Sequence, residues 1–316
     1  MGKGKNKGKG KGKTKPMSAP TLLPLPAVHA ERYLSLLKKS LLNQLYLENE
    51  ARLDFLLDRL LMQRPVNLEA LIPEYLGIRD QPVHHNLEAM RKNGRFLGFF
   101  STDGKEILFT RNFSFVAHTM IGQARLDNIQ QCLDTIIAEK VPGDLIETGV
   151  WKGGATVFMR GYLMAHNIRK RRVWVADSFA GLPKADCAQD RLEMDCSADT
   201  LPYLAVSQEA VESLFARYDL LDDKVKFLKG WFKDTLPTAP IKKLALLRLD
   251  GDLYESTMDG LNNLYHKVSP GGFVIVDDYH AVPACKVAVD EFRARHAILE
   301  PLETIDHSAV YWRKSF

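Results

Sequence analysis

The chain has 316 residues, 46% of them hydrophobic, which is enough for one substantial core and an appendage. No apolar run approaches the ~20 residues that a membrane-spanning helix needs, so we expect neither a membrane protein nor a membrane partner. The four cysteines show no Cys-x-x-Cys pair and no histidine cluster at zinc spacing, which excludes a common zinc site and favours reduced thiols in a cytoplasmic protein.

The net charge of +4 comes from one end of the chain. Residues 1–16 hold seven lysines and no acid, and without these seven charges the rest of the chain carries about −3. A lysine- and glycine-rich tail cannot bury apolar surface, and a Pro-rich stretch follows it at 20–26. We therefore predict a disordered basic tail and linker over residues 1–26, with no apolar core of a secretory signal.

Residues 27–114 are predicted to form a helical extension. Leu34, Leu37, Leu41 and Leu45 fall on one stripe of a helix over 31–48, and a second apolar helix is expected over 52–62. Aromatic-rich runs at 95–100 and 106–110 flank Asp-Gly, which is the signal of a β-hairpin. Such a hairpin is too apolar to stand alone, so we expect it to serve as a lid, an oligomer contact or a part of its own core.

Residues 115–316 read as an α/β domain. After a helix over 125–140, short apolar strands at 144–148, 172–176, 225–229, 244–249 and 272–276 alternate with helices at 154–167, 207–218, 256–267 and 283–295. Such alternation predicts a Rossmann-like, mostly parallel sheet with helices on both faces. Residues 300–304 and 308–313 are expected to close the sheet as an antiparallel hairpin.

The end of the first predicted strand has the features of a nucleotide site. Glu147 lies in the strand, Gly149 permits a sharp turn after it, and Gly153 and Gly154 would allow a ligand close to the next helix. The spacing is not the Gly-x-Gly-x-x-Gly of dinucleotide enzymes, and no phosphate-binding lysine motif is present. These features favour a nucleoside that carries no phosphates.

The next two strand ends supply partners for such a nucleoside. Asp177 follows the second strand, where an acid can accept hydrogen bonds from both ribose hydroxyls, although a helix cap or an Asx-turn is the alternative. Trp231 follows the third strand and is placed to stack on an adenine, with plain core packing as the alternative.

Four carboxylates follow the fourth and fifth strands: Asp250, Asp252, Asp277 and Asp278. The carboxyl ends of adjacent strands would bring them together, where they would repel one another without a cation. Hard oxygen ligands in this number favour Mg²⁺, whereas helix capping or surface exposure would explain any one of them alone. A metal that holds a substrate hydroxyl near a methyl donor suits O-methyl transfer, with Asp252 as the general base and His280 as its rival.

The chain resembles the macrocin O-methyltransferase family, whose members methylate sugar hydroxyls of natural products. The matching motifs include Ala117–Gly122, Pro142–Trp151, Asp177–Phe179 with Gly181–Pro183, Gly230–Phe232, Asp250–Asp252, Gly271–Phe273, Asp277–Tyr279 and Tyr311–Arg313. They extend over residues 31–48 and 115–316, whereas 49–114 looks longer than is usual for the family. Segment 184–206, which would lie over the acceptor, has no family pattern.

The resemblance implies a class I methyltransferase that takes its methyl group from S-adenosylmethionine (SAM). It also implies Mg²⁺ on Asp250, Asp277 and Asp278, Asp252 as base, Met120 beside the acceptor, and a homo-oligomer. We assign the cofactor site to Thr119, Met120, Glu147, Thr148, Gly149, Asp177, Ser178, Gly230, Trp231 and Asp250. The predicted acceptor is a small, glycosylated molecule.

Several other functions fit parts of the pattern. A nicotinamide oxidoreductase would share the acid at Asp177, but the glycine spacing and the four aspartates argue against it. A nucleic-acid methyltransferase would explain the lysine tail, but the rest of the chain is acidic and has no basic stripe interleaved with aromatics. A methyl acceptor in a polyketide or peptide, and a non-catalytic SAM-binding protein, also stay open.

Overall fold

The structure is a computed structural model. It describes residues 27–46, scattered residues between 49 and 66, then 96–102, 105–111, 116–192 and 195–315. The predicted tail over 1–26 lies outside these residues, as do 54, 55, 57 and 58 of the helix predicted over 52–62, whose residues 52, 53, 56, 59, 60 and 61 are helical. Within them, no helix is long and apolar enough to cross a membrane.

The central element is a seven-stranded sheet in the order β5-β4-β3-β6-β7-β9-β8. Its strands are β3 (Asp144–Thr148), β4 (Val173–Asp177), β5 (Val225–Lys229), β6 (Leu244–Leu249), β7 (Val268–Val276), β8 (Glu303–Thr304) and β9 (Val310–Arg313). The first five run parallel, and β9 pairs antiparallel with both β7 and β8. The predicted α/β fold and its C-terminal antiparallel hairpin are therefore confirmed.

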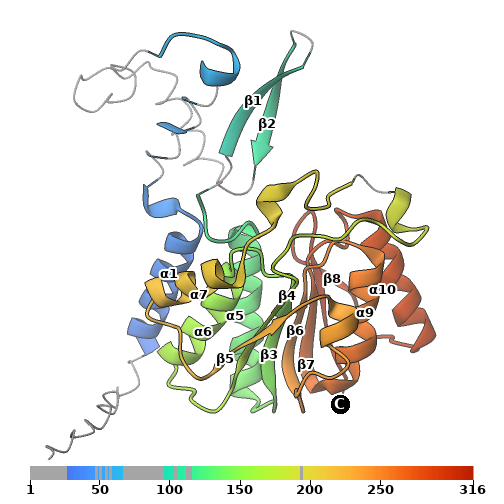
Figure 1. Cartoon of the computed structure of the whole chain (residues 1–316). Helices are drawn as coiled ribbons and strands as arrows, with labels where there is room; N and C mark the ends of the chain where they lie inside the picture. Colours follow the sequence, from blue (N-terminus) through green and yellow to red (C-terminus); the bar gives the residue numbers. More distant parts are fainter. Residues whose placement is uncertain are drawn as a thin grey trace, which may run out of the picture.

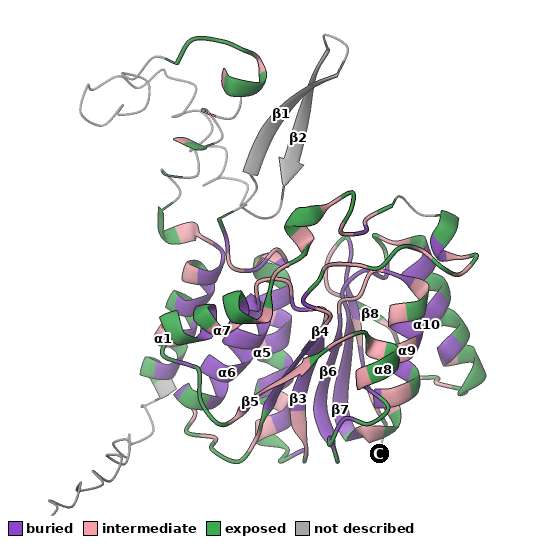
Figure 2. Cartoon of the chain, viewed as in Figure 1, coloured by how far each residue is buried: buried purple, intermediate pink, exposed green. Residues whose placement is uncertain are grey.

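Helices cover both faces of this sheet (Figure 1). One layer contains α1 (Ala27–Leu41), α5 (Gly122–Ala138), α6 (Gly154–Ala165) and α7 (Gln208–Arg217). The other contains α8 (Phe232–Thr235), α9 (Tyr254–Leu264) and α10 (Pro283–Arg295). Successive residues of β3 point to opposite faces of the sheet. Leu145 packs in the hydrophobic cluster with the first helix layer, and Ile146 packs in the cluster with the second. Figure 2 shows this buried interior between the helices.

The strand order reverses between β3 and β6, which places the switch point of the sheet between these two strands. Backbone hydrogen bonds join the carboxyl ends of four adjacent strands. Asp250 donates to Thr148, Asp277 to Leu249 and Gly149 to Ala176. The loops after β4, β3, β6 and β7 therefore start side by side, and their first side chains face one cleft.

The first helix and the last parallel strand differ most from their predicted ends. The helix predicted over 31–48 stops at Leu41, because the chain turns at Asn43, which has a left-handed φ of 57°. Leu45 is consequently 41% exposed and does not join the apolar stripe. The last parallel strand starts at Val268, four residues earlier than expected, with a register shift beside it.

The hairpin predicted over 95–110 is present as β1 (Phe96–Thr102) and β2 (Lys105–Arg111). The two strands pair antiparallel with Thr102 opposite Lys105, so two residues connect them, as the Asp-Gly signal predicts. The side chains of the hairpin lie outside the described residues. Its role as lid, contact or core element stays a prediction.

Helix α1 packs into the core of the α/β domain. Its residues Ala30, Leu34, Leu37 and Leu41, with Leu42 just after it, are buried in the same cluster as α5 and α6. The contact with α6 is close because Gly161 has no side chain, and a Cβ there would lie 2.5 Å from Leu37. An ion pair between Lys38 and Asp127 joins α1 to α5 at 2.5 Å. The first helix is therefore structural, although 84 residues of the sequence separate Leu41 from Leu126.

We predict that Leu34→Ala lowers the free energy of unfolding by about 2–5 kcal/mol, because Leu34 is 0% exposed and its loss leaves a cavity between helices. Leu36→Ala on the same helix is the matched control. Leu36 is 55% exposed, so its truncation should change stability by less than about 0.5 kcal/mol. Urea unfolding measures both variants, and equal losses would show that α1 does not share the core.

Candidate active site

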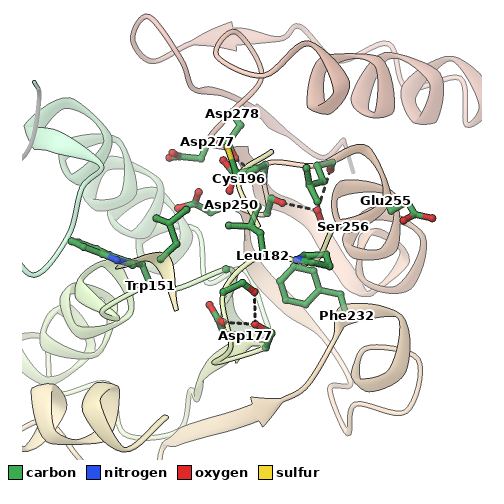
Figure 3. A pocket seen from close by; sticks show the side chains of 18 of the residues that line it. Trp151, Asp177, Leu182, Cys196, Phe232, Asp250, Glu255, Ser256, Asp277 and Asp278 are labelled. Carbon is green, nitrogen blue, oxygen red and sulfur yellow. Dashed lines mark hydrogen bonds between the residues drawn. The ribbon is translucent and has the colours of Figure 1, made fainter. Parts of the chain in front are cut away.

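A cavity of about 980 Å³ lies at the carboxyl ends of the parallel strands. Asp177 after β4, Gly149 after β3, and the acids after β6 and β7 all line it. Figure 3 shows Asp250, Asp277 and Asp278 gathered at one end of the cavity and Asp177 toward the other. The site therefore has an acidic end and a separate end where the loops after β3 and β4 meet.

The structure brings together most of the residues that the sequence singles out. The lining includes Met120, Gly149, Asp177, Ser178, Trp231, Asp250, Asp252, Asp277 and Asp278. The predicted residues outside the lining are Thr119, Glu147, Thr148, Gly230 and His280. Thr119 and Thr148 are buried, whereas the His280 side chain is exposed and lies edge-on against the Tyr279 ring.

The acidic end is built around a fully buried arginine. Arg248 in β6 is 0% exposed, and its guanidinium donates to Glu147, to Asp250 at 2.6 Å and to Asp277. Glu147 is thus an ion-pair partner of Arg248 and does not line the cavity, and its assignment to the cofactor site stays a prediction. Burial raises the pKa of Glu147 to about 8, although the charge of Arg248 opposes this rise.

A second arginine reaches the same carboxylates from α5. Arg125 donates through Nη1 to Asp277 and through Nε to Asp306 at 2.8 Å. Asp277 therefore accepts from Arg125 at one oxygen and from Arg248 at the other. Ser308, in the turn between β8 and β9, donates to the Asp277 carbonyl at 2.7 Å. The C-terminal hairpin thereby supports the acidic end.

Asp250, Asp277 and Asp278 are arranged as a metal site would require. One carboxylate oxygen from each lies within 4.8 Å of those of the other two. Burial, followed by the charge of Asp277, raises the pKa of Asp250 to about 6, and burial with the neighbouring acids raises that of Asp278 well above its usual value. Carboxylates held together against their charge fit a hard divalent cation.

Asp252 stands beside this group. Its backbone is left-handed, with φ of 60°, and its N–H donates to the Asp278 carboxylate at 3.1 Å. Burial, and then the charges of Asp250 and Asp277, raise the pKa of Asp252 to about 7. A carboxylate with this pKa accepts a proton readily at neutral pH.

Asp177 forms the Asx-turn that was the alternative considered for it. Its carboxylate accepts from the Phe179 N–H at 2.7 Å, which is an Asx-turn, and from the Val150 N–H at 2.7 Å. A carboxylate has about four acceptor positions, and the Ser178 hydroxyl also lies 3.4 Å from this one. Burial raises the pKa of Asp177, while the bonds from Val150 and Phe179 oppose the rise.

The glycines after β3 are each required by a close neighbour that a Cβ would meet. Gly149 has φ of 85°, and a Cβ there would lie 1.7 Å from the Asp250 carbonyl oxygen. A Cβ at Gly153 would meet Val211 at 2.6 Å, and one at Gly154 would meet the His118 carbonyl at 2.2 Å. The prediction of a sharp turn is confirmed, but the close neighbours of Gly153 and Gly154 are α7 and the loop before α5.

Sequence reasoning missed both arginines and the aromatic wall of the cavity. Arg248 was detectable as the one charge inside the apolar strand Leu244–Leu249, directly before the acids. Trp151 lines the cavity and donates from its indole to the Tyr203 carbonyl at 3.1 Å. No sequence signal pairs residues so far apart, because the contact depends on how segment 184–206 folds back.

A second hollow, of about 860 Å³, lies at the opposite end of the sheet. Six basic residues line it: Arg169, Lys170, Arg171, Arg172, Lys242 and Lys243. No aromatic residue belongs to its lining, so it lacks the interleaved stacking groups of a nucleic-acid-binding surface.

The seven-stranded doubly wound sheet, closed by an antiparallel C-terminal hairpin and with its cleft at the switch point, is the Rossmann-like fold of class I methyltransferases. The fold agrees with that of the calicheamicin methyltransferase CalS11, which is 19% identical and superimposes with a TM-score of 0.50 over 60% of this chain and 78% of that one. A sequence model of the macrocin-O-methyltransferase (TylF) family matches residues 30–314, and the chain belongs to this family.

Its relatives are O-methyltransferases. The chain is 57% identical to the demethyldecarbamoylnovobiocin O-methyltransferase of Streptomyces niveus, over 65% of this chain and 79% of the relative. It is 51% identical to the mycinamicin III 3''-O-methyltransferase of Micromonospora griseorubida, over 65% and 81%. The chain also superimposes on the structure of the O-methyltransferase NovP with a TM-score of 0.69 and 45% sequence identity. The match covers 91% of this chain and all of that one. The protein is therefore a SAM-dependent O-methyltransferase.

We predict that the metal-free protein becomes less stable between pH 5.5 and 8.5. The folded pKa values of about 6 for Asp250, 7 for Asp252 and 8 for Glu147 exceed the unfolded values of ~4. Their protonation therefore favours folding at low pH, and this contribution is lost as the pH rises through the folded values. Melting temperatures in EDTA measure the fall.

The same acids give this prediction a control. Asp252→Asn removes one of the raised carboxyl groups, so the decrease of its melting temperature over this pH range should be smaller than in the unmodified protein. Mg²⁺ should raise the melting temperature more at pH 8 than at pH 6. A melting temperature that stays level or rises with pH in EDTA would contradict the electrostatics of the site.

Proposed function

We propose that the protein transfers a methyl group from SAM to a sugar hydroxyl of a glycosylated natural product of the antibiotic type, with Mg²⁺. The observation that carries this proposal is the single cavity that holds Asp177 near one end and the acids after β6 and β7 at the other. The relatives act on a novobiocin precursor, on a rhamnosyl tetracenomycin and on a mycinamicin, which supports this class of acceptor.

The SAM nucleoside is proposed to bind at the end of the cavity formed by Gly149, Asp177 and Ser178. The free acceptor positions of Asp177 would take the ribose hydroxyls, and Trp231, which is 37% exposed and lines the cavity, would flank the adenine. The remaining cavity, bounded by segment 184–206, is left for the acceptor. Met120 and Trp151 lie on its wall.

Asp250, Asp277 and Asp278 are proposed to hold the Mg²⁺. When bound, the ion would lower the pKa of an acceptor hydroxyl and fix its oxygen. The arginines support this arrangement, because Arg248 and Arg125 hold the Asp277 carboxylate in place. Among the described residues, the Asp278 carboxylate accepts one hydrogen bond, from the Asp252 N–H.

Asp252 is proposed to take the proton from the acceptor hydroxyl. The oxygen then forms its bond to the methyl carbon as the bond from that carbon to sulfur breaks, and S-adenosylhomocysteine leaves. The geometry favours Asp252 over His280, because Asp252 lines the cavity and the exposed His280 does not. A polyketide or peptide hydroxyl is the alternative acceptor, and a mass-spectrometric screen with and without the sugar on the same aglycone distinguishes the two.

The oligomeric state is a separate expectation. We propose a homo-oligomer, in keeping with the sequence-based prediction. Light scattering tests this directly, and replacing residues 96–109 by a Gly-Ser linker tests the hairpin. A lid predicts an unchanged mass and a weaker acceptor reaction, whereas an oligomer contact predicts a changed mass.

We predict that Asp252→Asn still folds and binds SAM but loses ~10²–10⁴ in turnover, the usual contribution of a general base. Asp223→Asn, which alters an exposed carboxylate before β5, should leave turnover unchanged. The measurement is steady-state kinetics with calorimetric SAM affinity beside it. If Asp252→Asn kept near-normal turnover and His280→Ala were inactive, His280 and not Asp252 would be the general base.

We predict that SAM binds in EDTA with little change of affinity, whereas turnover requires a divalent cation. Asp277→Asn should raise the Mg²⁺ concentration needed for half-maximal rate, because it removes a ligand and leaves SAM contacts intact. Calorimetry of SAM and titration of Mg²⁺ against rate check both parts. Full methylation by the EDTA-treated protein would refute the metal assignment.

A further inference from the structure

Segment 184–206 carries a buried aspartate that the proposed mechanism does not use. Asp190 is 1% exposed although it belongs to a short 3-10 turn, Asp190–Leu192, of a segment whose described residues are mostly exposed or half-buried. The described part of this segment forms one wall of the cavity through residues Lys184, Ala185, Asp186, Cys196, Leu201, Tyr203 and Leu204. A carboxylate turned inward from such a segment requires partners in the body of the domain.

Its partners are the first backbone amides of α9. One carboxylate oxygen accepts from the Tyr254 N–H at 2.6 Å, and the other accepts from the Glu255 N–H at 3.2 Å. The residue at the N-cap position of this helix is Leu253, whose side chain makes no cap bond. Asp190 therefore caps α9 from a distant part of the sequence, and its negative charge lies at the positive end of the helix.

The capped end of α9 is the end that follows Asp252. Only Leu253 separates Asp252 from Tyr254, and Asp252 has the left-handed φ of 60° that a non-glycine residue adopts only when its surroundings hold it. Ser256 donates to the Gly251 carbonyl at 2.6 Å, and Leu253 donates to the same carbonyl at 2.6 Å. The loop over residues 250–253 is thus held by its own hydrogen bonds, by the bond to the Asp278 carboxylate and by the bonds that Asp190 makes to the start of α9.

We infer that Asp190 is a positioning residue, which couples the segment over the acceptor to the loop that carries Asp252. This inference rests on the proposed role of Asp252 as general base. Asp190 holds the first turn of α9 and so sets the place of the loop that carries the Asp252 carboxylate. Asp190 touches no substrate in this scheme.

The test is a double-variant cycle of Asp190→Ala and Asp252→Asn. We expect Asp190→Ala to keep SAM affinity and to lose about tenfold or more in kcat, because a misplacement of ~1 Å can cost about 10²-fold. In the Asp252→Asn background the same change should have no further effect on kcat, since the group that it positions is gone. Asp190→Asn, whose side-chain oxygen still accepts an N–H, should recover most of kcat.

Asp199→Ala is the matched control, because Asp199 lies in the same segment and only its exposed ion pair with Lys184 is lost. A loss of kcat from Asp190→Ala that is equally large in both backgrounds would make Asp190 a structural cap only and overturn the inference, while leaving the general base in place. Normal turnover of Asp252→Asn alone would overturn the base and the inference with it. An unchanged kcat for Asp190→Ala would also overturn the inference.

Discussion

The site depends on one buried cation. Arg248 stands in the middle of the sheet with no exposure to solvent, and Glu147, Asp250 and Asp277 share its guanidinium. Burying an arginine costs desolvation free energy, and burying three neighbouring carboxylates adds the repulsion between their charges. The attraction between the guanidinium and the carboxylates offsets both costs. Because the four side chains come from β3, β6 and β7, this ion cluster also fixes how the carboxyl ends of three strands align.

The charges of the cluster determine what the cavity can bind. With Asp252 and Asp278 included, five carboxyl groups face two arginines, Arg248 and Arg125, so the acidic end retains an excess of negative charge when all are ionised. The arginines occupy Asp277 and part of Asp250, whereas Asp278 has no cationic partner among the described residues. The excess negative charge is therefore concentrated on the carboxylates that face the cavity, where a bound cation can neutralise it. The carboxylates that pair with the arginines inside the sheet are neutralised by them.

Much of this molecule follows from local sequence patterns. The five parallel strands, the β-hairpin and the acids at the strand ends could be predicted, because alternation of apolar segments and Asp-Gly turns depends on neighbouring residues. The roles of Glu147 and of Gly153 could not, since they depend on Arg248 and Val211, which are remote in sequence. Leu45 was expected on the apolar face of the first helix but is exposed, because the left-handed residue Asn43 turns the chain out of the helix before it.

Segment 184–206 shows the same limit more strongly. It has no regular periodicity, and its fixed points are single contacts such as the Trp151 indole on the Tyr203 carbonyl and Asp190 on α9. Such contacts leave no repeating pattern in a sequence. A buried aspartate in a polar stretch looks like any surface aspartate until the partner amides are known, which is why Asp190 could not be singled out from the sequence.

The position of β6 has a consequence for the kinetics of folding. Thr148 in β3 pairs with Leu249 in β6, about a hundred residues later, while β3, β4 and β5 are neighbours in sequence order. The chain must close a long loop before the central pair forms, and contacts of such sequence separation slow folding. During synthesis the ribosome releases β3, β4 and β5 with one edge of β3 unpaired, and that edge must wait for β6. The cleft at the switch point and this long-range strand pairing thus arise from the same reversal of strand order.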